Sequence, residues 1–152
     1  MMPDNEFVYD REKMSDSEIV EYNRNLCERF PFLKCDDTFE STWLDDMPFG
    51  WRVAFGEQMC EELKAELVRI GYLEQYQIRQ IKEKFGTLHW YDAGYPKNSR
   101  IEMIIDKYEA FSEVTCIDCG SLAKFVSLDW ISPYCEKCIG DTPCRKIEEH
   151  LR

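Results

Sequence analysis

Two cysteine pairs in the last third of the chain constrain its fold more than any other feature. Cys116 and Cys119 form one C-x-x-C pair, and Cys135 and Cys138 form a second pair after fifteen intervening residues. This spacing is typical of a site in which four thiolates bind one zinc ion tetrahedrally. Such a site keeps no open coordination position, so its metal is structural. The sequence therefore predicts one structural Zn²⁺ bound by these four cysteines.

The alternatives to a metal site are four buried thiols or two disulfides. The chain contains eight cysteines, and its first residues lack the basic start and apolar run of a signal peptide. No apolar stretch approaches the length that spans a membrane. We therefore expect a cytoplasmic protein in a reducing compartment, where cysteine thiols bind metals or lie in protein cores.

The formal net charge of −11 is distributed unevenly along the chain. Residues 1–49 carry 13 acidic and five basic side chains, a net charge of −8, whereas residues 115–152 carry a net charge of −1. The cysteine segment thus lacks the basic surface that nucleic-acid binding usually needs. The acidic first third is either a solvated surface or a surface that attracts a basic protein. On the second interpretation, the candidate partner-binding residues are Asp36, Asp37, Trp43, Asp45 and Asp46.

Three stretches have the apolar periodicity of amphipathic helices. The first follows a capping box formed by Ser15 and Glu18, and the third follows a similar pair, Ser99 and Glu102. The second ends at Gly71, which suits the position after a helix because glycine tolerates positive φ. The expected core positions of the three helices are Ile19, Tyr22, Leu26 and Phe30, then Phe55, Met59, Leu63, Leu67 and Ile70, and finally Ile101, Ile104, Ile105, Tyr108 and Phe111.

The stretch between the second and third helices predicts a β-hairpin. Residues Tyr76–Tyr91 are rich in Ile, Tyr, Trp and Thr, and Gly86 lies where a turn would fall. Ile78 and Ile81 have opposite parity in the first arm, which indicates a β-bulge. A second, shorter hairpin is expected between the cysteine pairs, within residues 122–134.

Together these elements predict an α+β fold, in which helices pack on a β-hairpin or small antiparallel sheet and a zinc ribbon follows. Thr142 and Pro143 are typical of the N-cap and first residue of a helix, here a short terminal helix that opens at this pair and continues through Lys146 to Leu151. No linker precedes Cys116, so the ribbon is expected to pack against the rest. The chain divides into an acidic helical region, a helix–hairpin–helix core and a ribbon segment, at residues 1–48, 49–113 and 114–152.

The run Ile81–Tyr91 resembles a motif, close to I-K-E-K-F-G-x-L-R-F-Y, of small, largely uncharacterised bacterial and phage proteins. In that family a helix, a T-C-x-x-C-G motif, a tryptophan and a second cysteine pair follow. The corresponding residues here are Thr115–Gly120, Trp130 and Cys135–Cys138. The resemblance covers residues 49–138 and departs at His89, where arginine is usual. It implies a zinc-ribbon α+β protein with no agreed activity, in a bacterial host cytoplasm.

The sequence contains no signature of an enzyme: no P-loop, G-x-G-x-x-G, H-E-x-x-H or G-x-S-x-G motif occurs. We therefore expect no catalysis and no small-molecule substrate. His89 is more consistent with a half-exposed strand residue than with a base or ligand, and Cys144 with a plain helix cysteine. Lys82, Glu83 and Lys84 form either a charged binding edge or a solvated strand surface.

The leading functional hypothesis is a non-enzymatic, zinc-stabilised protein-binding module. The phage resemblance suggests a partner with a basic surface, such as a host defence or nucleic-acid-processing enzyme inhibited stoichiometrically, as anti-CRISPR proteins do. The alternative is a zinc-ribbon protein that binds nucleic acid or regulates transcription; direct nucleic-acid binding and membrane binding are less favoured. Most large aromatic residues should lie in the core, with one or two exposed as anchors. These residues are Trp43, Phe49, Trp51, Trp90 and Trp130.

Overall fold

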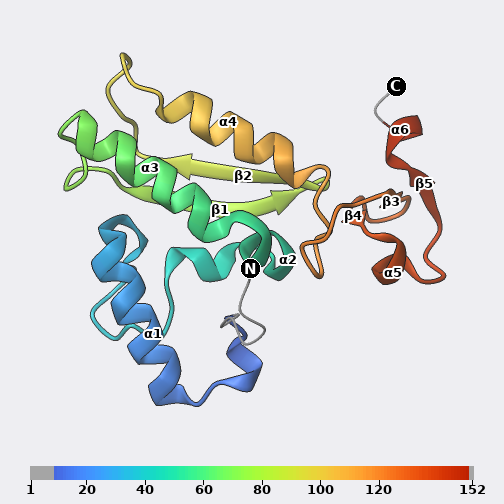
Figure 1. Ribbon diagram of the computed structural model, residues 1–152, viewed down its shortest axis with the longest axis horizontal. Helices are drawn as coiled ribbons and strands as arrows, with labels where there is room; N and C mark the ends of the chain where they lie inside the picture. The colour runs from blue at the N-terminus through green and yellow to red at the C-terminus, as the bar shows by residue number, and fades with distance from the viewer. Residues whose placement is uncertain (1–8, 151–152) are drawn as a thin grey trace, which may run out of the picture.

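The computed structural model describes residues 9–150 and confirms an α+β fold (Figure 1). Helices surround a two-stranded hairpin, and a small three-stranded ribbon continues from one end of it (Figure 1). The helical elements are η1 (Arg11–Lys13), α1 (Asp16–Arg29), η2 (Pro31–Leu33), η3 (Trp43–Asp46), α2 (Phe49–Trp51), η4 (Arg52–Gly56), α3 (Glu57–Arg69), α4 (Ile101–Ser112), α5 (Glu136–Ile139) and α6 (Ile147–His150). The strands are β1 (Ile78–Lys84), β2 (Thr87–Asp92), β3 (Phe125–Ser127), β4 (Pro133–Tyr134) and β5 (Cys144–Lys146).

The first two predicted helices begin and end where the sequence indicates. The Ser15 hydroxyl accepts a hydrogen bond from Glu18 N (3.2 Å), and the Glu18 carboxylate accepts one from Ser15 N (2.9 Å), which completes the capping box of α1. The second helix is built from α2, a π-helical turn η4 and α3 in direct succession. It ends before Gly71, whose φ of +70° matches the prediction.

The predicted hairpin consists of β1 and β2, which pair antiparallel with a register shift between Ile78 and Gln80. This shift confirms the expected bulge. Phe85 and Gly86 form the turn, and both have positive φ, +54° and +81°. Such a turn matches the right-handed twist of the two strands.

The outer edge of β2 is closed by α4, which lies beside it (Figure 1). Leu88 N donates to Ser112 Oγ (2.8 Å), and Trp90 N donates to the Glu109 carboxylate (3.0 Å). These side chains satisfy backbone groups that would otherwise offer a template for pairing with another strand. The hairpin therefore depends on α4 for its edge as well as for its cover.

The second predicted capping box, at Ser99, is wrong. The N-cap of α4 is Arg100, and the Ser99 hydroxyl donates to Pro96 O (2.7 Å) instead. Arg100 N donates to the Glu66 carboxylate of α3 (2.7 Å), so a residue from another helix caps α4. Hydrogen bonds from the Arg69 side chain and then from Arg100 N lower the pKa of Glu66 to about 2.

One hydrophobic core joins the N-terminal helices, the hairpin and α4. Leu26 of α1, Leu63 of α3, Leu88 of β2 and Ile101 of α4 all belong to it. The predicted core positions are buried or half-buried, except that Phe111 is 44% exposed at the last turn of α4. No helix within residues 9–150 combines the length and apolarity needed to cross a membrane.

The ribbon contains the expected hairpin and one unexpected strand. β3 pairs with β4 on one side, and β5 pairs with β3 on the other. Cys144–Lys146 is therefore a strand, and the predicted helix begins only at Ile147. Because Val126 pairs with Arg145, hydrogen bonding to β3 overrides the local helix signal of Thr142 and Pro143. Leu151 lies outside the described residues.

Candidate metal centre

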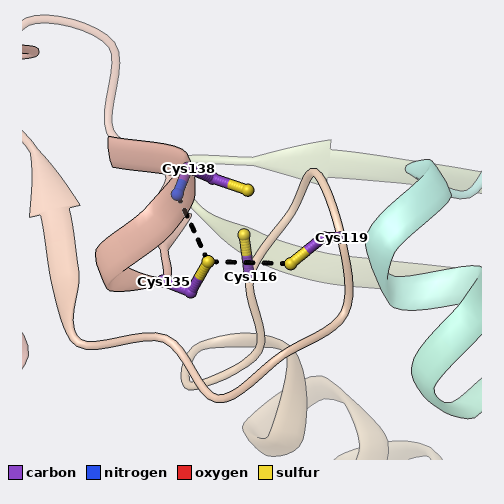
Figure 2. Close-up of side chains that lie close together, drawn as sticks. All are labelled: Cys116, Cys119, Cys135 and Cys138. Carbon is purple, nitrogen blue, oxygen red and sulfur yellow. Dashed lines mark hydrogen bonds between the residues drawn. The ribbon is translucent and has the colours of Figure 1, made fainter. Parts of the chain in front are cut away.

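The four predicted ligands converge at one point (Figure 2). Cys116 and Cys119 belong to the turn that follows α4, and Cys135 and Cys138 belong to the start of α5. Their sulfur atoms all lie within 4.8 Å of one another. This group is the only set of at least three cysteine, histidine or acidic side chains of this kind among the described residues. The cluster can hold a metal ion.

The separation of the sulfur atoms fits a tetrahedral four-thiolate site. A metal–sulfur bond of about 2.3 Å gives sulfur–sulfur separations of about 3.8 Å in a tetrahedron, and Cys119 Sγ lies 3.6 Å from Cys135 Sγ. All eight cysteines are free thiols, so the disulfide alternative is excluded in this structure. Hydrogen bonding by the side chain and backbone of Ser121 lowers the pKa of Cys119 to about 6, whereas hydrogen bonding with Cys135 raises the pKa of Cys138. A thiolate is the form that binds metals.

Local backbone geometry holds each cysteine pair in a tight knuckle. Gly120 N donates to Cys116 O (3.0 Å), and the φ of Gly120 is +87°, a backbone conformation that favours glycine in such a turn. In the second knuckle, Cys138 N points to Cys135 Sγ (3.4 Å), the interaction dashed in Figure 2. Cys135 is also the N-cap of α5, which directs both sulfur atoms of that pair toward the first knuckle.

The first knuckle packs against the start of the long helix, at Gly50 and Trp51, which we call the seat. Gly50 N donates to Ile117 O (2.9 Å), and the Trp51 indole N–H donates to Thr115 O (2.9 Å). A Cβ atom at Gly50 would lie 2.2 Å from Cys116 O, so only glycine permits this approach. The ribbon therefore packs against the rest of the protein, as the missing linker predicts. The sequence did not predict this contact, although an isolated glycine within a helix often has a packing reason.

Some of the candidate partner-binding residues are exposed, whereas others are packed or hydrogen-bonded within the protein. Asp36, Asp37 and Asp46 are exposed, whereas Trp43 is half-buried and packs against the core. The side chain of Asp45 is only 17% exposed. It accepts hydrogen bonds from Thr42 N (2.7 Å), Arg52 Nη1 (2.8 Å) and the Tyr9 hydroxyl (3.0 Å). Asp45 is therefore part of an internal network that ties the N-terminal segment to the long helix.

An open cavity of about 810 Å³ lies beside this network. Asp46 and Glu83 contribute carboxylates to it, Lys82 contributes a cation, and Phe49 contributes an exposed ring. Burial, followed by the charge of Asp45, raises the pKa of Asp46. Asp46, the third exposed aspartate beside Asp36 and Asp37 in what we call the acidic loop, thus borders a recess lined by both charged and apolar side chains.

The remaining aromatic and candidate catalytic residues lie apart from the cysteine cluster. Trp51 and Trp90 are core residues, whereas Trp130 is 76% exposed in the loop between β3 and β4. His89 is a half-exposed strand residue, as predicted. Cys144 lies on a strand rather than a helix. Neither His89 nor Cys144 belongs to the cluster of four sulfur atoms.

The fold and the site define a small α+β protein whose C-terminal ribbon carries a four-cysteine metal-binding cluster. No protein-family model, curated protein or solved structure matches the chain. The resemblance to bacterial and phage proteins therefore remains a prediction.

Proposed function

We propose that this protein is a non-enzymatic binding module whose ribbon is held by one structural zinc ion. The observation that carries the proposal is the cluster of four cysteine sulfurs from two opposed knuckles. Four thiolates fill all positions of a tetrahedral ion, which leaves none for water or substrate. Zinc is the metal most typical of two C-x-x-C knuckles at this spacing.

Elemental analysis of protein purified without chelator tests the metal assignment. We expect about one equivalent of zinc per chain, bound tightly because the binding free energy is also folding free energy. Less than about half an equivalent of zinc contradicts the proposal. The visible absorption of an iron–sulfur centre would also contradict it, because iron–sulfur clusters use the same cysteine ligands.

The module would act by stoichiometric binding to a protein with a basic surface, through its acidic loop. Asp36 and Asp37 are exposed on the segment between η2 and η3, and Asp46 is exposed at the end of η3. A nucleic-acid-processing enzyme is the natural target class, because its substrate channel is basic and an acidic surface can compete for it. An inhibitor of host defence of the anti-CRISPR kind would work in this way. Asp45 is left out of the surface because it serves the internal network.

Charge reversal tests whether the acidic loop binds the partner. Affinity purification from the native host, with mass spectrometry, first identifies the partner. Lysine substitution of Asp36, Asp37 and Asp46 should then weaken binding, and more so at low salt, where screening is least. The matched control reverses three exposed acids elsewhere, Glu74, Glu102 and Asp106, and changes the net charge equally. Equal affinities of wild type and both variants would show that the acidic loop is only a solvated surface.

The alternative is that the ribbon itself binds nucleic acid. Its support is the exposed Trp130 together with Arg145 and Lys146, which are exposed on β5. The ribbon segment nevertheless carries a net charge of −1, and a basic surface normally supplies most of the affinity for nucleic acid. Protein binding through the acidic loop is therefore the favoured function.

A further inference from the structure

The hairpin separates the charges that alternate in the sequence at Lys82, Glu83 and Lys84. Glu83 turns to the tip of the hairpin, where its carboxylate accepts a hydrogen bond from Gly86 N (2.7 Å). Lys82 pairs with His89 across the two strands, and Lys84 pairs with Thr87. Since successive strand residues point to opposite faces, both lysines share one face and Glu83 does not. A sequence of mixed charge thus becomes a face that is basic.

Aromatic side chains lie on this same face. The rings of His89 and Tyr91 are stacked, with centroids 6.0 Å apart and planes inclined by 19°. Lys82 Nζ lies 5.7 Å from the centre of the Tyr91 ring, and Tyr91 is 42% exposed. The opposite face holds the buried residues of the hairpin, such as Ile81, Leu88 and Trp90. We define the outer hairpin face as Gln80, Lys82, Lys84, Phe85, Thr87, His89 and Tyr91.

Phe85 lies in the turn at the end of this face, where it lines a small recess together with Thr87, Glu113 and residues of the ribbon. Its ring is 73% exposed, and its φ is +54°, a left-handed conformation that is unfavourable for a bulky side chain. Burial cannot explain a large apolar ring that remains mostly in solvent. A strained residue with an exposed side chain is a feature of functional sites.

Carboxylates border this face on both sides: Lys82 lines the same recess as Asp46 and Glu83, and two glutamates contact β2. Glu109 accepts a hydrogen bond from Trp90 N (3.0 Å), and Glu113 accepts one from the Thr87 hydroxyl (3.3 Å). Glu109 belongs to α4 and Glu113 is the C-cap of that helix, so both lie along the β2 edge. The seven residues of the outer hairpin face include two lysines and no acid, in a chain whose net charge is −11. The face is therefore electrostatically distinct from the rest of the protein.

We propose that the outer hairpin face binds single-stranded nucleic acid. Bases would stack on Tyr91, His89 and Phe85, while Lys82 and Lys84 would contact the phosphates. A β-surface with exposed aromatic rings beside cations is a recurrent platform for unpaired bases, because every base has a flat face that can stack. A duplex hides those faces, so single strands are favoured. The inference goes beyond the proposed function and involves residues separate from the acidic loop.

Fluorescence anisotropy with a labelled single-stranded oligothymidine tests the proposal on the zinc-loaded full chain. The two lysines predict weak binding, with Kd of about 10⁻⁵ M at physiological salt. They also predict a slope of log K against log salt of about −1.4, from about −0.7 for each phosphate contact. No saturable binding at about 50 mM salt overturns the proposal. Equal affinity for a duplex of the same length overturns it as well.

Substitutions on the face separate binding from folding. Lys82→Gln with Lys84→Gln should abolish most of the salt dependence, and Tyr91→Ala should weaken binding about tenfold through lost stacking. Phe85→Gly is the sharpest variant, because glycine suits the positive φ. It should weaken binding severalfold and leave the thermal midpoint unchanged or higher. The control Lys107→Gln removes an exposed lysine of α4 that pairs with Glu62, and it should bind like wild type.

Three results with these variants would overturn the inference. The first is unchanged affinity of both Tyr91→Ala and Phe85→Gly, which would remove the stacking platform. The second is equal weakening by the Lys107 control, which would make the effect one of net charge. The third is competition by polyglutamate as effective as that by unlabelled oligothymidine, which would identify the face as a site for acidic proteins instead.

Discussion

The helical core and the ribbon belong to one chain, but different interactions stabilise their folded structures. The core cluster contains 22 buried residues, most of them in helices α1 to α4 and both long strands and the rest in the short helical turns and loops between them. The ribbon cluster contains three, Ala123, Val126 and Ile147. Fixing the backbone of each residue costs roughly 1–2 kcal/mol in conformational entropy. Burial of apolar side chains offsets this cost in the core, whereas burial of three side chains cannot offset it in the ribbon. The ribbon therefore needs its four cysteines as a substitute for a core.

The strongest test of this contrast removes one sulfur ligand. Cys119→Ser should abolish tight zinc binding, which contributes an apparent ~10–16 kcal/mol in small zinc modules. We expect the ribbon resonances in an NMR spectrum to collapse while those of α1 and α3 persist. Cys144→Ser is the control, because Cys144 lies outside the cluster, and it should keep a full equivalent of zinc. A folded ribbon in zinc-free Cys119→Ser protein would show that the metal is dispensable.

The reciprocal test disrupts the core. Ile105→Asp places a charge at a buried position of α4, and we expect it to destabilise the protein by at least about 3 kcal/mol. Thermal unfolding followed by circular dichroism measures the effect. Met103→Asp, on the exposed face of the same helix, should shift the midpoint little. If both variants melt like wild type, the buried stripe of α4 is not what stabilises the core.

The smallest effect is expected where the two regions meet. Gly50→Ala would push a methyl group against Cys116 O, and we expect about 1–3 kcal/mol of destabilisation from the forced shift. Gly56→Ala in the same long helix meets no atom closer than 3.3 Å and should change stability by less than about 1 kcal/mol. Urea unfolding of both variants distinguishes them. Similar free energies of unfolding for the two variants would mean that the backbone around Gly50 accommodates the added methyl group without destabilisation.

Local signals predicted the parts of the fold that depend on local geometry. The cysteine spacing predicted the cluster because each C-x-x-C pair is one tight turn, which brings its two sulfur atoms close together. The capping box at Ser15 formed because both of its partners lie within four residues. The turn at Gly86 and the end of α3 at Gly71 followed from backbone preferences in the same way.

Signals failed where a residue distant in sequence competed. Ser99 shows the same capping pattern as Ser15, but α4 is capped at Arg100 instead, whose backbone N–H donates to the Glu66 carboxylate, 34 positions earlier in the chain. Thr142 and Pro143 suggested a helix that β3 converts to a strand. The sequence does not distinguish Asp45 from its exposed neighbour Asp46, yet hydrogen bonds from Arg52 and Tyr9 hold the Asp45 side chain in a largely buried position. Such partners are invisible until the chain is folded.

The seat at Gly50 and Trp51 has a consequence for the order of events during synthesis. Trp51 precedes its acceptor Thr115 by 64 positions, so the ribosome makes the seat well before the knuckle that occupies it. Chains emerge at about 5–20 residues per second, and early segments generally begin to fold first. The helical core can thus be in place while the cysteines are still being made. The metal binding proposed above would then complete the folding of the molecule instead of starting it.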